Sequence, residues 1–265
     1  MNELLMKIIS WNVNSIRARI NYVKELLRTE KPDFLCLQET KIIDQEFPYK
    51  SFTELGYHSY FFGIPSYNGV AILSKKKHIN IEKLNLCNKL DARIITAETS
   101  WFDIMSVYVP AGGDTPDPNL NPKFKHKLLF LDELNQLLKT KQKIIVCGDL
   151  NVAPHEDDVW SHKSLINVVS HTEIEREKIK KILEDCNLVD AVRHFLNPPQ
   201  NIYTWWSYRS PNYKINNRGR RLDHIWISKE IKNKLVNSKI LDKFRSKDKP
   251  SDHVPVCLEI KTRVL

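Results

Sequence analysis

Short runs of apolar residues alternate along the chain with stretches in which apolar residues recur at helical spacing. Residues 7–11 (KIISW) are predicted to form a buried strand. An amphipathic helix follows, because apolar residues recur at helical spacing from Ile16 to Leu27 and Pro32 lies beyond its end. A second buried strand is predicted at 33–37 (DFLCL).

The same alternation continues through the rest of the chain. Further strands are predicted at 57–62 and 70–74, as a hairpin around a loop at 63–69, and at 94–98, 102–109, 143–148, 222–228 and 254–260. A helix is predicted at 124–138, and Thr172 with Glu175 forms a capping box that begins another. Residues 110–122 are rich in Pro, Gly, Asp and Asn and therefore predict a loop.

Two segments of the chain resemble each other. The motif KIISWNVN (7–14) and the motif KIIVCGDLNV (143–152) both place a short apolar run before Asn-containing polar residues. Two similar halves packed face to face would give a sandwich of two sheets with helices outside, although chance could also produce so short a match. No low-complexity linker divides the chain, so a single α/β domain spanning 1–265 is predicted.

Composition narrows the classes of protein that fit. The chain has 265 residues, is 42% hydrophobic and 28% charged, and carries a net charge of +9. A basic balance favours nucleic acid as a partner, although solvated lysine-rich faces would explain it equally well. The apolar settings of Cys36, Cys147 and Cys257 indicate buried thiols and a reducing, cytoplasmic compartment. No signal peptide and no membrane-spanning run is predicted.

Polar residues stand at the ends of many of the predicted strands. They are Asn12, Glu39, Tyr108, Asp149, Asn151, Asp223, Asp252 and His253. Buried carboxylates are costly unless they are paired or bound to a cation, which makes Glu39 and Asp149 candidate site residues rather than surface-turn residues. Taken singly, the others have ordinary readings: turn or cap residues, a structural histidine and a core tyrosine.

The types of these residues are informative together. Carboxylate and amide oxygens suit Mg²⁺ or Mn²⁺ better than zinc. A carboxylate such as Asp149 could take a proton from water, while a histidine and a tyrosine could face the charge that develops on a phosphate. The set therefore predicts metal-assisted hydrolysis of a phosphodiester.

The motifs WNVN, QETK, YVPAGG, GDLNVAP, RRLDHIW and SDHVPV occur in this order between residues 7 and 260. This series resembles the exonuclease III family of abasic-site endonucleases, within the larger endonuclease/exonuclease/phosphatase superfamily. GDLN and SDH alone would point only to the superfamily, whereas QETK, RLDHIW, YTWW and KPSDHVPV narrow it to the DNA-repair branch. The resemblance implies a four-layer α/β sandwich, with two mixed β-sheets packed face to face and helices outside.

The resemblance also implies roles for individual residues. The metal ligands or their neighbours would be Asn12, Glu39, Asp149, Asn151, Asp252 and His253, with Lys41 supporting Glu39. The catalytic groups would be Tyr108, Asp149, Asn151, Asp223 and His253. Asp149 would activate or position the attacking water, and Asn151 would orient it. His253, paired with Asp223, would contact the scissile phosphate, as would Tyr108.

The segment 201–223 interleaves aromatic residues with arginines and predicts a DNA-contacting loop, although a tryptophan-rich core edge beside a basic loop is the alternative. The predicted DNA contacts are Trp205, Arg209, Arg218, Arg220 and Arg221, with Trp205 matching a position that lines the pocket for a base-less sugar. Ala111, Asp114 and Arg220 depart from the family pattern, which bears on substrate preference.

The resulting expectation is a monomeric DNA-repair phosphodiesterase that depends on Mg²⁺, with Mn²⁺ as a possible substitute. It would hydrolyse the backbone 5′ of abasic sites in double-stranded DNA and act on blocked 3′ ends as a 3′-5′ exonuclease and 3′-phosphatase. One alternative is a superfamily phosphatase that acts on a small or lipid phosphate. Another is a nonenzymatic DNA-binding protein, which would be expected to lack at least one of Glu39, Asp149, Asn151 or His253.

Overall fold

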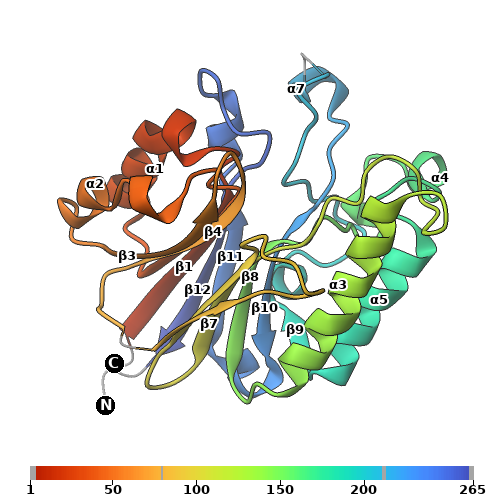
Figure 1. Cartoon of the computed structure of the whole chain (residues 1–265). Helices are drawn as coiled ribbons and strands as arrows, with labels where there is room; N and C mark the ends of the chain where they lie inside the picture. Colours follow the sequence, from red (N-terminus) through yellow and green to blue (C-terminus); the bar gives the residue numbers. More distant parts are fainter. Residues whose placement is uncertain (1–3, 79, 211–212, 263–265) are drawn as a thin grey trace.

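Two β-sheets stacked face to face form the centre of the molecule, as the computed structural model shows for residues 4–78, 80–210 and 213–262 (Figure 1). In the described chain each sheet has six strands. The first has the order β11 (Leu235–Ile240), β12 (Val256–Thr262), β1 (Leu4–Asn12), β2 (Phe34–Gln38), β4 (Tyr67–Ser74) and β3 (His58–Ile64). The second has the order β5 (Ile81–Leu84), β6 (Ile94–Glu98), β7 (Asp103–Tyr108), β8 (Ile144–Asp149), β10 (Asp223–Ser228) and β9 (Leu188–Asp190).

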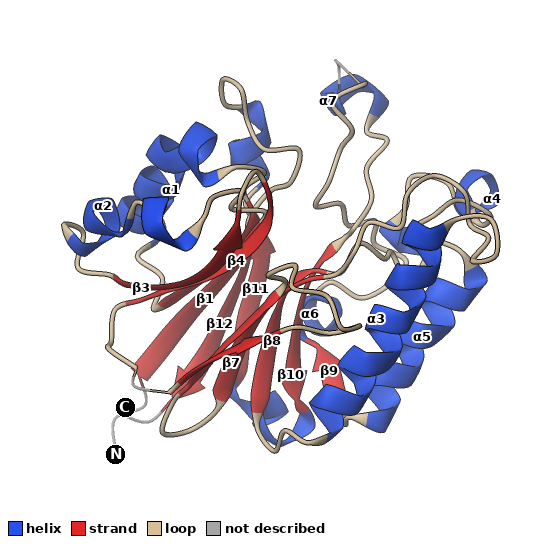
Figure 2. Cartoon of the chain, in the orientation of Figure 1, coloured by secondary structure: helices blue, strands red, loops and turns tan. Residues whose placement is uncertain are grey.

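Helices cover the outer face of each sheet, which gives four layers (Figure 2). Helices α1 (Ile16–Glu30) and α2 (Tyr49–Thr53) lie on the first sheet, and α3 (Pro122–Lys139) and α5 (Glu173–Asp185) lie side by side on the second. The short helices are α4 (His162–Leu165), α6 (Ala191–Phe195) and α7 (Tyr213–Asn216), with single 3-10 turns at Asp44–Glu46, Glu156–Asp158, Lys229–Lys234 and Asp242–Ser246. The predicted four-layer α/β sandwich is confirmed.

Apolar clusters fill the three interfaces between the layers. Ile8, Phe34 and Ile145 belong to the cluster between the two sheets. Trp11 and Val23 belong to the cluster under α1, and further clusters lie under α3 and α5. Removing this much apolar surface from water is the main stabilising term for such a fold, at roughly 25 cal/mol per Å². Cys36, Cys147 and Cys257 lie in these clusters as buried free thiols, as predicted.

The two similar sequence segments occupy matching places in the two sheets. Strand β1 pairs in parallel with β2 and antiparallel with β12. Strand β8 likewise pairs in parallel with β7 and antiparallel with β10. The polar residues that follow β1 and β8 therefore emerge at the same edge of the sandwich.

Most predicted elements are confirmed, and the differences have local causes. The hairpin loop predicted at 63–69 is much shorter, because pairing continues to Ile64 and resumes at Tyr67. Strands β5, β9 and β11 were missed because they are short or lie at a sheet edge and lack clean apolar alternation. Among the described residues, no helix is both long enough and apolar enough to cross a bilayer.

Candidate functional site

Six strand ends meet at one edge of the sandwich. Strands β1, β2, β7 and β8 end there, and the antiparallel strands β10 and β12 begin there. The register places Asp149 opposite both Tyr108 and Asp223. The side chains predicted from strand ends are therefore brought together by the sheet topology.

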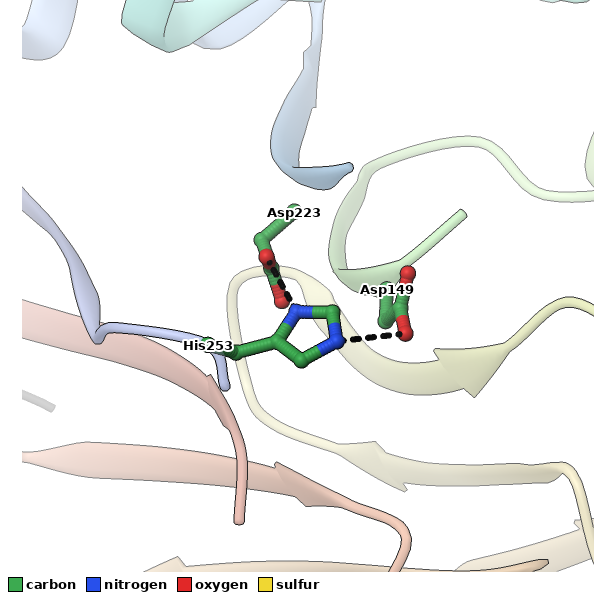
Figure 3. Close-up of side chains that lie close together, drawn as sticks. All are labelled: Asp149, Asp223 and His253. Atoms are coloured by element: carbon green, nitrogen blue, oxygen red, sulfur yellow. Dashed lines mark hydrogen bonds and ion pairs between the residues drawn. The ribbon is translucent and has the colours of Figure 1, made fainter. Parts of the chain in front are cut away.

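His253 lies between two carboxylates at the centre of this edge (Figure 3). Its Nδ1 donates to Asp223 Oδ2 at 2.8 Å, and its Nε2 lies 3.6 Å from Asp149 Oδ2. The three residues are 4%, 0% and 1% exposed, in the order His253, Asp223 and Asp149. Each offers an atom within 4.8 Å of the others, so together they form an acidic group compact enough to hold a cation if the imidazole is neutral.

The electrostatics of this group favour a charged imidazole. Burial opposes the charge on His253, but the carboxylates of Asp223 and Asp149 outweigh it and raise the pKa of the imidazole to about 10. Burial also raises the pKa of Asp149 to about 7, against the opposing pull of His253. A charged imidazole has no lone pair for a metal, so His253 is better suited to an anion than to a cation.

Asn12 links the two strongest carboxylate candidates. Its buried amide donates to Glu39 Oε1 at 2.9 Å and to Asp149 Oδ2 at 2.8 Å. The backbone N–H of Asn151 donates to Asp149 Oδ1 at 2.9 Å, and its side chain donates to the Val109 carbonyl at 2.9 Å. The amides therefore fix both carboxylates in place.

Glu39 is partly exposed and has a basic neighbour. Lys41 Nζ lies 2.8 Å from Glu39 Oε2 and also donates to Asn14 Oδ1 at 2.6 Å. Burial opposes the charge of Glu39, but Lys41 and the Asn12 amide outweigh it and lower the pKa of the carboxyl. Glu39, Lys41 and Asn14 have left-handed φ values of 50°, 53° and 45°. Such strain outside glycine costs about 1–3 kcal/mol at a residue like Glu39 and is concentrated at functional sites.

Tyr108 is held beside Glu39 by an arginine that sequence reasoning missed. Burial, together with the negative charges of Glu39 and Asp149, raises the pKa of the phenol well above its ordinary value. The Arg93 guanidinium lies 4.8 Å from the Tyr108 ring centroid, and its Nη1 donates to the Tyr108 carbonyl at 3.2 Å. Arg93 stands alone before a strand, so no sequence pattern marked it.

The segment before β12 carries Asp252, which was predicted to lie near the metal, and Ser251, for which the sequence suggested no role. The Ser251 hydroxyl donates to the Asn12 carbonyl at 2.7 Å and accepts from the His253 backbone N–H at 3.1 Å. Asp252 accepts from Asn14 Nδ2 and from Trp205 Nε1, both at 3.0 Å. Asp252 thus joins the rim of the pocket, and Ser251 joins β12 to β1.

A cavity of about 670 Å³ adjoins this centre at Trp205. Residues on its walls include Asp114, Trp160, Trp205, Arg209, Arg218 and Arg220. The guanidinium of Arg218 lies 4.7 Å from the Trp160 ring, and that of Arg220 lies 5.5 Å from the Trp205 ring. Stacked arginines and indoles next to a buried acid–base group suit a nucleic-acid strand.

Arg221 does not belong to that surface, so its prediction as a DNA contact was wrong. Its side chain is 0% exposed. Its Nε and Nη2 donate to the two oxygens of Asp158 at 2.7 and 2.9 Å, and its Nη1 donates to Asp190 at 2.7 Å. The sequence run Arg220-Arg221 gave no sign that only one of the two side chains reaches the cavity.

Arg221→Met is expected to lower the free energy of unfolding by about 3–5 kcal/mol, because it removes the buried cation that pairs with both Asp158 and Asp190. Arg193 remains beside Asp158. Urea unfolding followed by circular dichroism measures this change. Arg218→Met, on the exposed cavity rim, is the matched control and should change stability by less than about 0.5 kcal/mol. An Arg221→Met protein as stable as the unchanged chain would contradict the structural role.

The donor set at this edge fits a divalent cation with a preference for oxygen ligands. Glu39, Asp149 and Asp252 offer carboxylate oxygens, and the Asn12 and Asn151 side chains add amide oxygens. One oxygen of the buried Asp223, Oδ1, has no hydrogen-bond partner. Glu39 and Asp252 both combine a lowered pKa with partial exposure, which suits cation ligands.

Comparisons with known proteins agree with this arrangement. A sequence model of the Endonuclease/Exonuclease/phosphatase family matches residues 9–253. Exodeoxyribonuclease III of Haemophilus influenzae is 32% identical over 272 residues, covering 97% of this chain and 100% of that protein. Recombination repair protein 1 of Drosophila melanogaster is 34% identical over 260 residues, covering 97% of this chain, which spans only 37% of that protein.

Solved structures give the same result. An AP endonuclease from Archaeoglobus fulgidus superposes with a TM-score of 0.89 at 36% identity, covering 96% of this chain and 98% of that one. A 3′ phosphatase, NExo from Neisseria, bound to a product DNA hairpin, has a TM-score of 0.88 at 28% identity, covering 96% and 99%.

Proposed function

Because this chain belongs to the Endonuclease/Exonuclease/phosphatase family, we propose that it cuts the DNA backbone 5′ of abasic sites and removes blocking groups and nucleotides from 3′ ends. Its exodeoxyribonuclease III relatives and AP endonuclease neighbours make it a phosphodiester-hydrolysing nuclease of DNA repair.

The observation that carries the proposal is the placement of Asp149 between Asn151 and His253. Asp149 has a raised pKa of about 7, which lets its ionised form accept a proton from water near neutral pH. Asn151 lies beside it and orients that water. The oxygen of the water forms a bond to phosphorus as its proton passes to Asp149. The bond from phosphorus to the 3′ oxygen breaks, and that oxygen keeps the electron pair and takes a proton from solvent, which leaves a 3′-hydroxyl end.

Charge on the phosphate is met by His253 and Tyr108. The imidazole is held in its charged form by Asp223, so it offers a fixed donor to the phosphate oxygens. Tyr108 has a strongly raised pKa, so its phenol keeps its proton and remains a donor. Both groups are buried, which increases the strength of such contacts relative to water.

Glu39 and Asn12 would hold a divalent cation, with Asp252 nearby. We assign this cation as Mg²⁺, with Mn²⁺ as a substitute, because the donors are oxygen atoms. The cation would supply positive charge next to the phosphate. Lys41 holds Glu39 in position, as the QETK motif suggested.

The cavity beside Trp205 would receive the nucleic acid around the reacting phosphate. Arg209, Arg218 and Arg220 would meet backbone phosphates, and Trp205 would contact the sugar or the neighbouring base. The charged rim and the net charge of +9 favour DNA over a small or lipid phosphate as substrate.

Asp223→Asn is expected to move the alkaline limb of the pH–rate profile to lower pH, because it removes the carboxylate that raises the pKa of His253. Turnover at pH 8 should fall by about 10–100-fold. The pKa of His253 in the folded protein lies above the ordinary value of 6.5. The pairing with Asp223 therefore stabilises the fold fully below about pH 6.5, and this stabilisation is lost as the pH rises through about 10. Measurements of kcat/KM from pH 6 to 10 test this expectation. An alkaline limb at the same pH as in the unchanged protein would contradict it.

A panel of labelled duplexes tests the proposed function. One carries a single tetrahydrofuran abasic analogue, one a 3′-phosphate, and one is undamaged, each with Mg²⁺ and with EDTA. We expect one cut 5′ of the analogue and release of the 3′-phosphate, both with Mg²⁺ alone. If every duplex stays uncut while an inositol phosphate is hydrolysed rapidly, the result would favour the superfamily phosphatase instead.

A further inference from the structure

A fully buried ion pair joins the two helices on the outer face of the second sheet. Lys127 of α3 and Glu175 of α5 are each 0% exposed and contact each other through Nζ and Oε1. The two helices lie side by side in Figure 1. Replacing a buried ion pair by apolar residues is often neutral or stabilising, so stability alone does not account for this pair.

Lys127 reaches past its partner to the loops that carry the site. Its Nζ donates to the backbone carbonyl of Asn151 at 2.7 Å and to that of Ala111 at 3.3 Å. Gly112 packs on the lysine stem: a Cβ there would lie 2.9 Å from Lys127 Cδ, and its φ is +91°. One ammonium group therefore fixes both the loop after β8 and the loop after β7.

Glu175 is linked through Ser170 to Arg220, which lines the cavity. Its two oxygens accept from the Ser170 backbone N–H at 3.0 and 2.9 Å, while Thr172 donates through its hydroxyl at 2.6 Å. The Ser170 hydroxyl accepts from Arg220 Nη1 at 2.6 Å. Arg220 stacks on Trp205, and Trp205 donates to Asp252. A continuous series of contacts thus runs from the Asn151 loop through Arg220 and Trp205 to Asp252.

We propose that Lys127 and Glu175 are positioning residues that fix Asn151 relative to the cavity wall at Ser170 and Arg220. This inference rests on the proposed function, since it concerns the geometry of the same hydrolysis. Asn151 adopts a left-handed φ of 53°, and a loop in that conformation needs contacts that hold it. A displacement of about 1 Å in a water-orienting group lowers the rate of the reaction by up to about 10²-fold.

The double variant Lys127→Met/Glu175→Gln separates positioning from stability. Methionine keeps a stem against Gly112, and glutamine keeps an acceptor for Ser170 and Thr172, while both buried charges are removed. We expect Lys127→Met alone to lower Tm, because the Glu175 charge loses its partner, and the double variant to recover most of that loss. Turnover of the double variant should remain about 10–100-fold below that of the unchanged protein.

DNA binding measured without the cation gives a readout that does not depend on catalysis. The affinity of the double variant for a 3′-phosphate duplex, measured in EDTA by fluorescence anisotropy, should stay within about threefold of the unchanged protein, and KM should also change little. The matched control is Asp132→Asn/Lys178→Met, which removes a partly exposed pair between the same two helices, and its kcat should not change.

A double variant with unchanged kcat would overturn the proposal, as would a loss of kcat that the Asp132→Asn/Lys178→Met control shares. If the double variant does not fold, Glu175→Gln alone tests the same point, because Lys127 then lacks its anchor, and a folded protein with unchanged kcat would again overturn it. The unchanged protein is assayed in parallel on the duplex panel. Its failure to cut any duplex would reject the proposed function, whereas normal cutting by all variants would reject only the positioning role.

Discussion

Replacing Asp149 with asparagine is expected to lower turnover on the abasic duplex by about 10³–10⁴-fold while leaving DNA affinity within a few-fold of its original value. The carboxylate lies 1% exposed between Asn12, Asn151 and His253, where its raised pKa suits proton abstraction from water. An asparagine of the same shape cannot accept that proton. Because the arginines of the cavity are untouched, binding of DNA should persist.

Single-turnover kinetics with Mg²⁺, together with anisotropy in EDTA, measure the two effects of Asp149→Asn separately. Asp103→Asn is the matched control, because Asp103 lies at the start of β7, at the end of the strands opposite the site. Its turnover should be unchanged. An Asp149→Asn enzyme that cuts at a near-normal rate would show that another group handles the water.

Replacing Glu39 with glutamine is expected to lower turnover by about 10²–10³-fold at 1 mM Mg²⁺, with partial recovery as the cation concentration rises. The change removes a charged ligand while preserving the shape of the side chain, and it leaves Lys41 without its partner at 2.8 Å. A weaker cation site is saturated only at higher Mg²⁺, so the loss should shrink along a titration.

A Mg²⁺ titration of kcat for Glu39→Gln and for the unchanged protein tests this expectation. Glu46→Gln, which alters an exposed glutamate in the 3-10 turn before α2, is the control and should leave the titration curve in place. A Glu39→Gln curve with unchanged midpoint and amplitude would show that the cation is held elsewhere.

Local patterns in the sequence predicted most of the central strands, whereas the four-layer architecture and the roles of the site residues were implied by the resemblance to a known family. Short apolar runs placed the central strands. Polar residues at the strand ends marked Glu39 and Asp149 singly, and His253 only together with the others. The sheet registers then bring Tyr108, Asp149 and Asp223 together, as such a sandwich requires. Edge strands such as β5 were missed, since exposure on one side removes the apolar signal.

What the sequence could not predict depends on burial and on contacts between distant segments. Arg220 and Arg221 are neighbours in the chain, yet only Arg220 lines the cavity, because Arg221 is turned toward Asp158. Lys127 lies in an ordinary amphipathic helix, where a lysine is usually solvated. Its contact with the Asn151 carbonyl spans 24 positions and becomes visible only when α3 and the β8 loop are packed together.

Two adjacent groups of side chains are candidates for holding the cation. Asn12 bridges Glu39 and Asp149, so the Glu39 carboxylate and the compact group of Asp149, Asp223 and His253 are adjacent candidate sites for the cation. Because His253 is charged and paired with Asp223, we assign the cation to Glu39 and the contact with the phosphate to His253.

Anomalous diffraction from crystals soaked in Mn²⁺ tests this assignment most directly. We expect an anomalous peak in contact with the Glu39 carboxylate, at the same strand ends as His253, and loss of that peak in Glu39→Gln crystals. A peak held by Asp149, Asp223 and His253 with none at Glu39 would contradict it.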